Sequence, residues 1–431
     1  MGFALFLFAI ILMMASLLFF PIIKFKKFKL ETYWIIILLF ACLMIFTSSV
    51  DNSLLFKSLI KNGGMNPLKL ITLFISTTIL SIFLDEVGFF KYLALFLISK
   101  VKTSQIKLFF TIYLLVSILT IFTSNDVIIL TFTPLIIYFT RSAKINPLPY
   151  LFGILTAANT WSIILIIGNP TNIYLALNQD INFLDYLKVM WAPGVVAGLS
   201  GLLMVYLIFR KTLKEELTPV SESPLLKNRF QIFLGCGFII ATIILLAISN
   251  FIQIQMWLIS LFMALLLSII IIIYNLFYKK SWVPIINTYK KAPWNFIPFI
   301  LGMFVLVEGI KQGGYIANIV QLVSGKNTII NFGILSFITS NLINNQPMSM
   351  LFSIILENIA DTNILKATYA SIIGSNLGVL LSPVGALAGL MWTRILHTKN
   401  INLTFFGYIK KIILVGLVTL SLTLLTLFVV L

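Results

Sequence analysis

Long apolar stretches recur along this chain, and the short loops between them carry most of its lysines and arginines. Residues 2–23, 253–277 and 403–430 are each long enough to cross a bilayer, which takes about 20 residues in a helix. Hydrophobic residues make up 60% of the chain and charged residues only 10%, and the mean hydropathy is +1.07. A soluble core does not need that much apolar surface, so the sequence predicts an all-α polytopic membrane protein.

The net charge of +17 comes from basic residues in loops rather than on one soluble face. This distribution follows the positive-inside rule and argues against nucleic-acid binding. The basic run at 24–29 predicts a cytoplasmic first loop and an external N-terminus, and the polar linker at 210–229 is also expected in the cytoplasm. Residues 2–23 have no charged leader and no small-residue cleavage site, so we expect this segment to remain in a protein of the plasma or inner membrane. Cys42 and Cys236 lie within apolar segments and indicate neither a disulfide nor a metal site.

The most unusual stretch is a polar break at residues 123–126, flanked on both sides by apolar arms. Each arm has only about 13 to 15 residues, fewer than the roughly 20 that a span needs. Lys107 before the break and Arg141 after it both carry the charge expected at the cytoplasmic face. A segment that leaves one face and returns to it predicts a re-entrant hairpin.

The next apolar segment, residues 149–177, is interrupted at 158–160 and again at 168–172. In lipid, a broken helix survives only where its freed backbone groups face protein or a wet cavity. Such breaks are the strongest sequence indication of the binding site of a secondary transporter.

A second hairpin and a second broken helix follow in the C-terminal half. The hairpin has its polar tip at 340–347, and the broken helix covers 367–396 with interruptions at 374–376 and 382–385. Four landmarks recur in the same order at spacings of 213 to 223 residues. Loop charges place the two hairpins on opposite faces, which predicts inverted repeats. The expected units are 1–67 and 230–293 as scaffold, 68–209 and 294–431 as the two repeats, and 210–229 as the linker.

Amide and hydroxyl side chains concentrate at these breaks, and they are the candidate substrate- and ion-binding residues. They suit a ligand that needs many moderate hydrogen bonds, and half-helix N-termini favour anions or oxygen-rich solutes. Unwound carbonyl and hydroxyl oxygens can equally hold Na⁺. The candidates are Ser124, Asn125, Asp126, Asn159, Thr160, Asn169, Thr171, Asn172, Asn344, Asn345, Gln346, Ser375, Asn376 and Ser382. We expect no resident cofactor and no metal centre, with Na⁺ or H⁺ as the coupling ion.

Glycine and proline mark the places where these helices are expected to open. Gly168 and Gly385 are expected to permit tight unwinding, and Pro170 and Pro383 each remove a helix donor. The further helix-break positions are Pro347 and Gly374.

Asp126 is the one acid at a hairpin tip. A carboxylate inside a membrane is costly and is functional by default, as a proton carrier or as the partner of a cation. The alternative is a structural carboxylate that caps the helix beginning near Val127.

Three motifs resemble the arsenite-pump branch of an ion-transporter superfamily that also holds sodium/proton antiporters, citrate transporters and divalent-anion/sodium symporters. Residues 125–126 (ND) followed by 130–134 (LTFTP) are similar to the ND…LTP hairpin of that branch. Residues 344–347 (NNQP) are similar to its NNMP, and residues 374–392 (GSNLGVLLSPVGALAGLMW) to its GxDLGxxxTPxGSLATLLW. The resemblance covers most of the chain from about residue 84 onward, and the last motif is quite specific.

The resemblance implies about ten transmembrane helices plus two re-entrant hairpins. It also implies a scaffold domain, often a dimer interface, and a transport domain that moves elevator-fashion. Arsenite-pump relatives export arsenite and antimonite, by proton exchange alone or with a separate ATPase partner. This chain has Asn159 and Asn376 where that branch has acids, which removes two candidate proton carriers and leaves Asp126.

We therefore expect a secondary active transporter whose first candidate substrate is an arsenite-type oxyanion or neutral hydroxide. The alternatives are a sodium-coupled carboxylate or inorganic-anion transporter and a sodium/proton antiporter, because residues 168–172 also resemble the amide-rich breaks of the anion symporters. A membrane enzyme would need clustered catalytic groups in a large external loop, and a passive channel would not need two broken hairpins. The sequence has no Walker motif, so ATP dependence would need a separate subunit.

Overall fold

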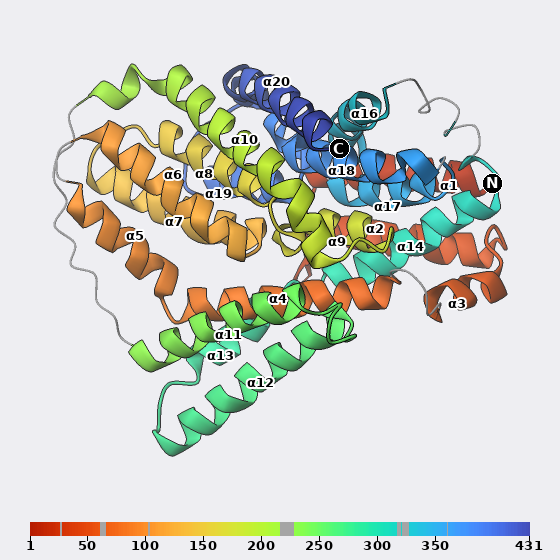
Figure 1. Ribbon diagram of the computed structural model, residues 1–431, viewed down its shortest axis with the longest axis horizontal. Coiled ribbons are helices and arrows are strands. Elements are labelled where there is room, and N and C mark those ends of the chain that lie inside the picture. Colours follow the sequence, from red (N-terminus) through yellow and green to blue (C-terminus); the bar gives the residue numbers. More distant parts are fainter. Residues whose placement is uncertain are drawn as a thin grey trace.

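The structure is a computed structural model of the chain, and it is helical almost throughout (Figure 1). It describes residues 1–25, 28–60, 66–101, 104–215, 228–316, 320, 327–359 and 361–431. Most of the linker expected at 210–229 lies outside these residues.

The N-terminal elements include a short β-hairpin that the sequence did not predict. Its two antiparallel strands pair Ile22 with Glu31 and form part of the basic first loop between α1 and α2. Lysines and apolar residues alternate here, and that period of two suits a strand with two different faces. The elements are α1 (Gly2–Phe19), β1 (Ile22–Phe25), β2 (Phe28–Glu31), α2 (Thr32–Phe46), α3 (Asn52–Ile60) and α4 (Pro67–Glu86).

The first helical hairpin and the first broken helix follow α5. These elements are α5 (Phe89–Lys100), α6 (Gln105–Phe122), α7 (Asn125–Ser142), α8 (Leu148–Trp161), the 3-10 turn η1 (Ile166–Gly168), α9 (Pro170–Leu177) and α10 (Phe183–Phe209). Both arms of the hairpin have 18 residues, more than the length expected from the apolar run. The reason is that Ser104 caps α6, and that the polar tip residues Asn125 and Asp126 form the first turn of α7 instead of a loop. Similarly, Asn182 caps α10, which is 27 residues long.

The middle of the chain contributes four helices: α11 (Arg229–Ala247), α12 (Met256–Phe277), α13 (Val283–Lys291) and α14 (Phe296–Gln312). The short helix α13 lies between α12 and α14, in a stretch with lysines at both ends. The C-terminal half then has the same order of elements as the first. They are α16 (Thr328–Ile343), α17 (Asn345–Leu356), α18 (Asp361–Leu377), the 3-10 turns η3 (Gly378–Leu380) and η4 (Pro383–Gly385), α19 (Leu387–Thr398) and α20 (Phe405–Val430).

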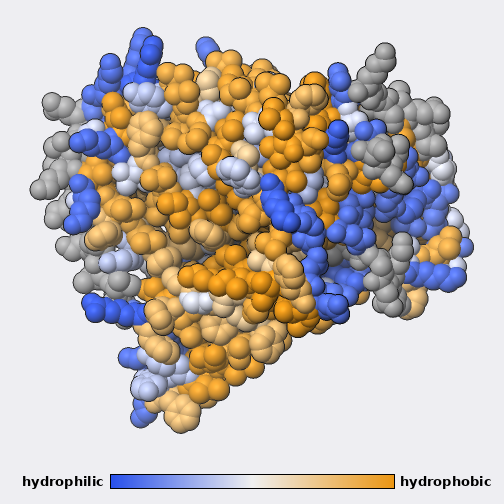
Figure 2. Space-filling model, in the orientation of Figure 1, coloured by the Kyte–Doolittle hydropathy of each residue, from blue (hydrophilic) through white to orange (hydrophobic). Residues whose placement is uncertain are grey.

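Eight helical segments among the described residues are long and apolar enough to cross a membrane: α1, α4, α6, α10, α11, α12, α13 together with α14, and α20. Shorter apolar helices, α2 and α16, come close to that length. Because α6 is one of the eight, the prediction that both arms of the first hairpin are too short to span is wrong for this arm. Hydrophobic residues cover most of the surface seen in Figure 2, as expected of a chain whose solvent is lipid.

The two halves of the chain contact each other through the long helices α10 and α20, which lie along the top of Figure 1. Within the halves, α6 packs on α8 and α16 packs on α18. The two broken helices are also joined by an aromatic cluster, in which the ring of Trp392 lies 5.3 Å from that of Phe152 and 5.7 Å from that of Tyr408. On the opposite side, α4 packs on α11, α12 and α13.

Candidate substrate and ion site

Asn376 lies at the centre of the largest polar cluster, where the two broken helices meet. Its Oδ1 accepts hydrogen bonds from Ser162 Oγ and Asn169 Nδ2, each at 3.0 Å. Its Nδ2 donates to Asn172 Oδ1 at 2.6 Å and to Ile372 O in its own helix at 2.8 Å. The four polar residues are all at most 1% exposed, so every hydrogen bond among them is shielded from water.

The break in the first helix is held open by side chains of the same cluster. Asn172 Nδ2 donates to Ser162 O at 2.8 Å and to Leu165 O at 3.2 Å, which satisfies two of the carbonyls that the break frees. Asn169 caps α9 by accepting from Thr171 N at 3.1 Å. Thr171 Oγ1 in turn lies 3.1 Å from Ser375 Oγ of the other broken helix. Without these partners, the unwound backbone would be too costly inside a membrane.

The first helical hairpin joins this cluster at its tip. Asn125 Nδ2 donates to Asn159 Oδ1 at 3.3 Å, and Asn159 Nδ2 donates to Leu155 O at 2.8 Å. Ser162 Oγ lies 3.3 Å from Asn159 O. Polar contacts therefore run without interruption from the tip of α7 through the first broken helix to Asn376 in the second.

The second hairpin contacts the second broken helix in a separate group. Asn344, which has a φ of +69°, donates through Nδ2 to Val384 O at 3.0 Å. Ser382 Oγ donates to Asn341 Oδ1 at 2.7 Å, and Asn341 Nδ2 donates to Gly378 O at 2.9 Å. Each hairpin tip is thus attached to the broken helix that follows it in the sequence.

The glycines at the breaks act through close packing, and not through the backbone freedom that the sequence suggested. Neither Gly168 nor Gly385 has a positive φ. A Cβ on Gly168 would lie 2.3 Å from Ser162 O, and one on Gly374 would lie 1.9 Å from Ser336 Oγ. A Cβ on Gly385 would meet backbone at 2.4 Å. The backbone segments therefore approach too closely for any side chain.

The prolines of the breaks all lie in a first turn. Pro170 is the first residue of α9, Pro383 is the first of η4, and Pro347 is the third of α17. First-turn N–H groups have no intrahelical acceptor, so proline costs no helix hydrogen bond there.

Three oxygens at the hairpin tips are buried and have no hydrogen-bond partner among the described residues. They are Ser124 Oγ, Asn125 Oδ1 and Asn345 Oδ1. Asn125 and Asn345 are the first residues of α7 and α17, so corresponding positions of the two halves each carry one unsatisfied acceptor. Oxygens of this kind are free to accept from a donor or to coordinate a cation, so the two tips are candidate ligand positions.

Asp126 is the second residue of α7 and is half-buried. Within the described part of the chain its carboxylate makes no hydrogen bond or ion pair that would fix it as a cap. The N-terminus of α7 supplies a favourable partial positive charge beside it.

Some predicted site residues stay outside the clusters, and two contributors were missed. Thr160 Oγ1 bonds within its own helix, to Thr156 O at 2.8 Å, and the backbone N–H of Gln346, rather than its side chain, donates to Asn344 Oδ1.

The missed residues are Ser162 and Asn341. Asn341 lies within the polar tip at 340–347, whereas Ser162 lies in the apolar stretch between the two interruptions of the first broken helix. A single serine or asparagine gives no sequence signal of its own.

A small cavity of about 10 Å³ lies beside the first hairpin tip, lined in part by Thr77, Ser81, Thr123, Ser124 and Thr242. That volume has room for about one water molecule or a bare ion.

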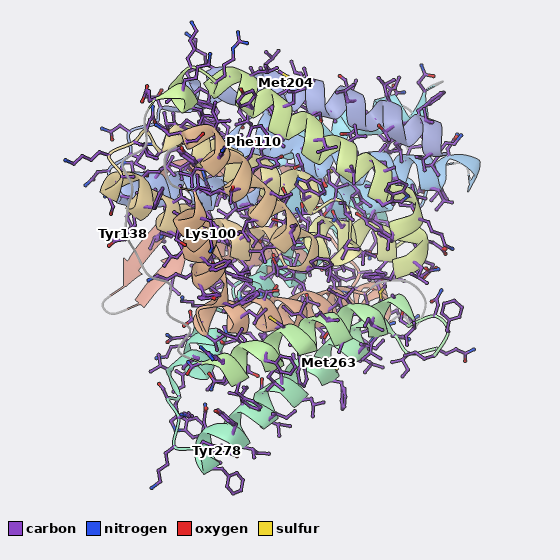
Figure 3. All side chains as sticks on the ribbon, turned by 60° about the vertical axis from the view of Figure 1, so that its left-hand side comes forward. Lys100, Phe110, Tyr138, Met204, Met263 and Tyr278 are labelled. Atoms are coloured by element: carbon purple, nitrogen blue, oxygen red, sulfur yellow. The ribbon has the colours of Figure 1, made fainter. Side chains whose placement is uncertain are left out.

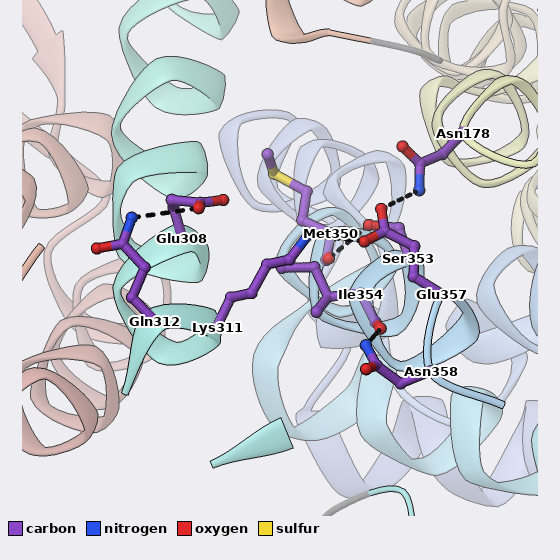
Figure 4. Close-up of polar contacts among 9 residues, drawn as sticks. All are labelled: Asn178, Glu308, Lys311, Gln312, Met350, Ser353, Ile354, Glu357 and Asn358. Carbon is purple, nitrogen blue, oxygen red and sulfur yellow. Dashed lines mark hydrogen bonds and ion pairs between the residues drawn. The ribbon is translucent and has the colours of Figure 1, made fainter. Parts of the chain in front are cut away.

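A polar contact at the ends of three helices joins α14 to the second hairpin (Figure 4). Lys311 Nζ of α14 lies 2.7 Å from Glu357 Oε2, at the end of α17, and Asn178 Nδ2, at the end of α9, donates to Glu357 Oε1 at 3.1 Å. At the other end of the molecule, Arg394 of α19 lies 3.8 Å from the carboxylate of Glu31.

Comparisons with known proteins point to one family. The family model CitMHS, described as citrate transporter, matches residues 2–374. Arsenical pump membrane proteins of Escherichia coli and Yersinia enterocolitica are 29% and 27% identical to the chain over 371 and 367 residues, with 81% of this chain and 84% of each relative covered. The crystal structure of the Alcanivorax borkumensis YdaH transporter matches with a TM-score of 0.55 at 12% identity, covering 99% of this chain and 97% of that one, and shows a shared fold.

Proposed function

Because the chain belongs to the CitMHS citrate transporter family and is a secondary transporter rather than an enzyme, we propose that it exports an arsenite-type oxyanion or neutral hydroxide, driven by an ion gradient. The arsenical pump membrane proteins that it resembles over most of its length support this substrate class.

The observation that carries the proposal is the chemistry of the cluster around Asn376. All of its side chains are amides or hydroxyls, which both donate and accept hydrogen bonds. A small neutral polyhydroxyl solute such as arsenous acid also donates and accepts. A di- or tricarboxylate would instead bring several negative charges against side chains that carry no charge, with only partial helix-end charges to offset them.

The proposed recognition uses hydrogen bonds and not arsenic–sulfur bonds. The two cysteines of the chain, Cys42 in α2 and Cys236 in α11, belong to neither polar cluster. A thiolate would hold trivalent arsenic too firmly for rapid release, whereas a set of moderate hydrogen bonds permits turnover.

A second candidate function is sodium-coupled transport of a carboxylate or inorganic anion, or sodium/proton antiport. Ser124 Oγ, Asn125 Oδ1 and Asn345 Oδ1 are buried oxygens with no partner among the described residues. Unwound carbonyls and half-helix C-terminal ends coordinate Na⁺ in transporters, and the C-terminal ends of α6 and α16 directly precede these oxygens in the sequence. The small cavity beside Ser124 is consistent with a bare ion rather than with a substrate.

We propose an elevator mechanism with inverted repeats for the transport step. Its support is that α17 packs on α9 while α7 packs on α19, so that each hairpin contacts the C-terminal half of the other repeat's broken helix. In this scheme the scaffold is 1–67 with 230–293, and α14 marks its boundary with the moving part. Assembly as a homodimer, an external N-terminus and an optional ATPase partner belong to the same proposal.

The proposal is tested with everted membrane vesicles from a strain that lacks its own arsenite exporters. Labelled arsenite is supplied under an imposed proton gradient, with and without Na⁺. Accumulation that collapses with a protonophore is the expected result. If folded protein is present and arsenite does not move while citrate or succinate does so with Na⁺, the second candidate function replaces the first.

A further inference from the structure

A groove of about 600 Å³ lies on the outside of the molecule, where α12, α13 and the start of α14 meet. None of its residues belongs to the polar clusters. The groove is lined by Ile272, Trp282, Ile285, Ile286, Tyr289, Lys290 and Trp294.

The orientation of α13 fixes which residues face the groove. On one side of the helix, Lys291 forms an ion pair with Glu86 of α4, and Asn287 Nδ2 donates to Glu86 Oε2 at 3.0 Å. Thr288 on the same helix is fully buried. Because α13 is tied to α4 in this way, Ile286 and Lys290, four residues apart on one helix face, stay exposed on the outside.

The aromatic walls of the groove present apolar faces. Tyr289 shares a hydrogen bond of 2.7 Å with Ser268 of α12, and Trp294 Nε1 donates to Tyr289 O at 2.6 Å. These polar atoms are therefore already satisfied within the protein. What remains for an occupant is ring surface together with Ile272 and Ile286, which suits a hydrocarbon chain.

Positive charge lies beside this apolar surface. Lys290 lines the groove, and Lys279 and Lys280 lie on the turn just before Trp282. All three lysines are exposed, and no acid among the described residues pairs with them. Glu86 of α4 already forms an ion pair with Lys291 and does not neutralise these three lysines.

The groove also lies at the level expected of a membrane–water boundary. The candidate span α12 ends at Phe277, and Tyr278, at its far end in Figure 3, follows directly. Figure 2 shows hydrophobic surface over the lower wedge of the molecule that ends in hydrophilic residues at the tip. Tryptophan, tyrosine and lysine together are typical of this boundary.

We propose that the groove binds one anionic phospholipid. An acyl chain lies along Ile272, Ile286 and the tryptophan rings, and the phosphate is held by Lys290 with support from Lys279 and Lys280. Clusters of lysines beside a membrane-embedded apolar surface favour anionic over zwitterionic headgroups.

Native mass spectrometry of the full-length protein in detergent tests this proposal. Phosphatidylglycerol and phosphatidylcholine with identical acyl chains are titrated separately, and the bound lipid is counted. Wild type is expected to bind one phosphatidylglycerol in preference to phosphatidylcholine. Lys290→Gln is expected to weaken phosphatidylglycerol binding about fivefold and leave phosphatidylcholine unchanged. Lys410→Gln, which removes an exposed lysine on α20, is the matched control and is expected to change neither.

Ile272→Trp fills the groove at a residue that is 39% exposed, so the fold is expected to tolerate it, with an unchanged thermal midpoint as the check. This variant is expected to lose binding of both lipids. Glycerol 3-phosphate, which has the headgroup charge without acyl chains, is expected not to compete. Equal affinity of wild type for both lipids, or equal behaviour of Lys290→Gln and Lys410→Gln, would overturn the proposal. So would loss of a dimer in Ile272→Trp with lipid binding intact, because the groove would then be a protein interface.

Discussion

Replacing Asn376 with alanine is expected to destabilise the protein and to stop transport. The substitution leaves Asn169 Nδ2 and Asn172 Oδ1 buried with no other partner among the residues that the structure describes. Each orphaned buried group costs about 1–3 kcal/mol, so the expected loss in the free energy of unfolding is about 2–6 kcal/mol. Ser162 keeps its contact with Asn159 O and adds little to the loss.

A second variant at the same position separates the two functions of the amide. Asn376→Asp keeps the oxygen that accepts from Ser162 and Asn169, but replaces the donor with an oxygen that faces Asn172 Oδ1. Asn172 cannot relieve this contact by turning its amide, because its Nδ2 already bonds two carbonyls. We therefore expect Asn376→Asp to be destabilised in the same range.

The assay is SDS titration of the purified protein in mixed micelles, with arsenite transport measured in parallel. The matched control is Asn358→Ala, which removes one hydrogen bond of 2.8 Å to Ile354 O at the C-terminal end of α17 and is expected to cost about 1 kcal/mol. If Asn376→Ala loses no more stability than the control, or if Asn376→Asp is as stable as wild type, then the hydrogen bonds of Asn376 to Asn169 and Asn172 do not stabilise the protein as we infer.

Other substitutions test the break in the first broken helix, the candidate coupling group Asp126 and the contact between α14 and α17. Gly168→Ala is expected to abolish transport, because its Cβ would lie 2.3 Å from a backbone oxygen, while Gly237→Ala, with nothing within 4 Å, is expected to be silent in the same vesicle assay. Asp126→Asn is expected to uncouple transport from the proton gradient while the protein stays folded, and an unchanged rate and pH dependence would exclude it as the coupling group. Glu357→Gln is expected to change stability by less than about 1 kcal/mol, since Lys311 and Glu357 are 43% and 37% exposed, yet to raise the transport rate by releasing α14 from α17. A transport rate equal to that of wild type would show that this ion pair does not restrain movement between α14 and α17.

The places where the helices break could be predicted from sequence, because their causes are local. Asn169 before Pro170 and Ser382 before Pro383 are each a capping side chain followed by a residue that cannot donate, and both positions begin a new helical turn. The first hairpin tip could be predicted because the four polar residues 123–126 interrupt an apolar run. The arm lengths could not, because the polar tip residues belong to the first turn of α7.

The partners of the site residues could not be predicted, because they depend on tertiary packing. Nothing local indicates that Asn172 meets Asn376, and Ser162 is one serine in an apolar segment whose importance comes only from the oxygen it faces. The position of α13 likewise depends on tertiary contacts, because two of its polar residues, Asn287 and Lys291, contact Glu86 of α4.

The contact between Asn172 and Asn376 joins positions 204 residues apart, which has a consequence for biogenesis. A ribosome delivers the first broken helix to the membrane long before its partner has been synthesised. During that interval the side chains of Asn169 and Asn172 need hydrogen-bond partners from water, the insertion machinery or a chaperone, because lipid acyl chains have no hydrogen-bonding groups. A nascent chain that stalls before residue 376 therefore exposes unpaired polar groups in the membrane. We expect such a chain to be a substrate for membrane proteases.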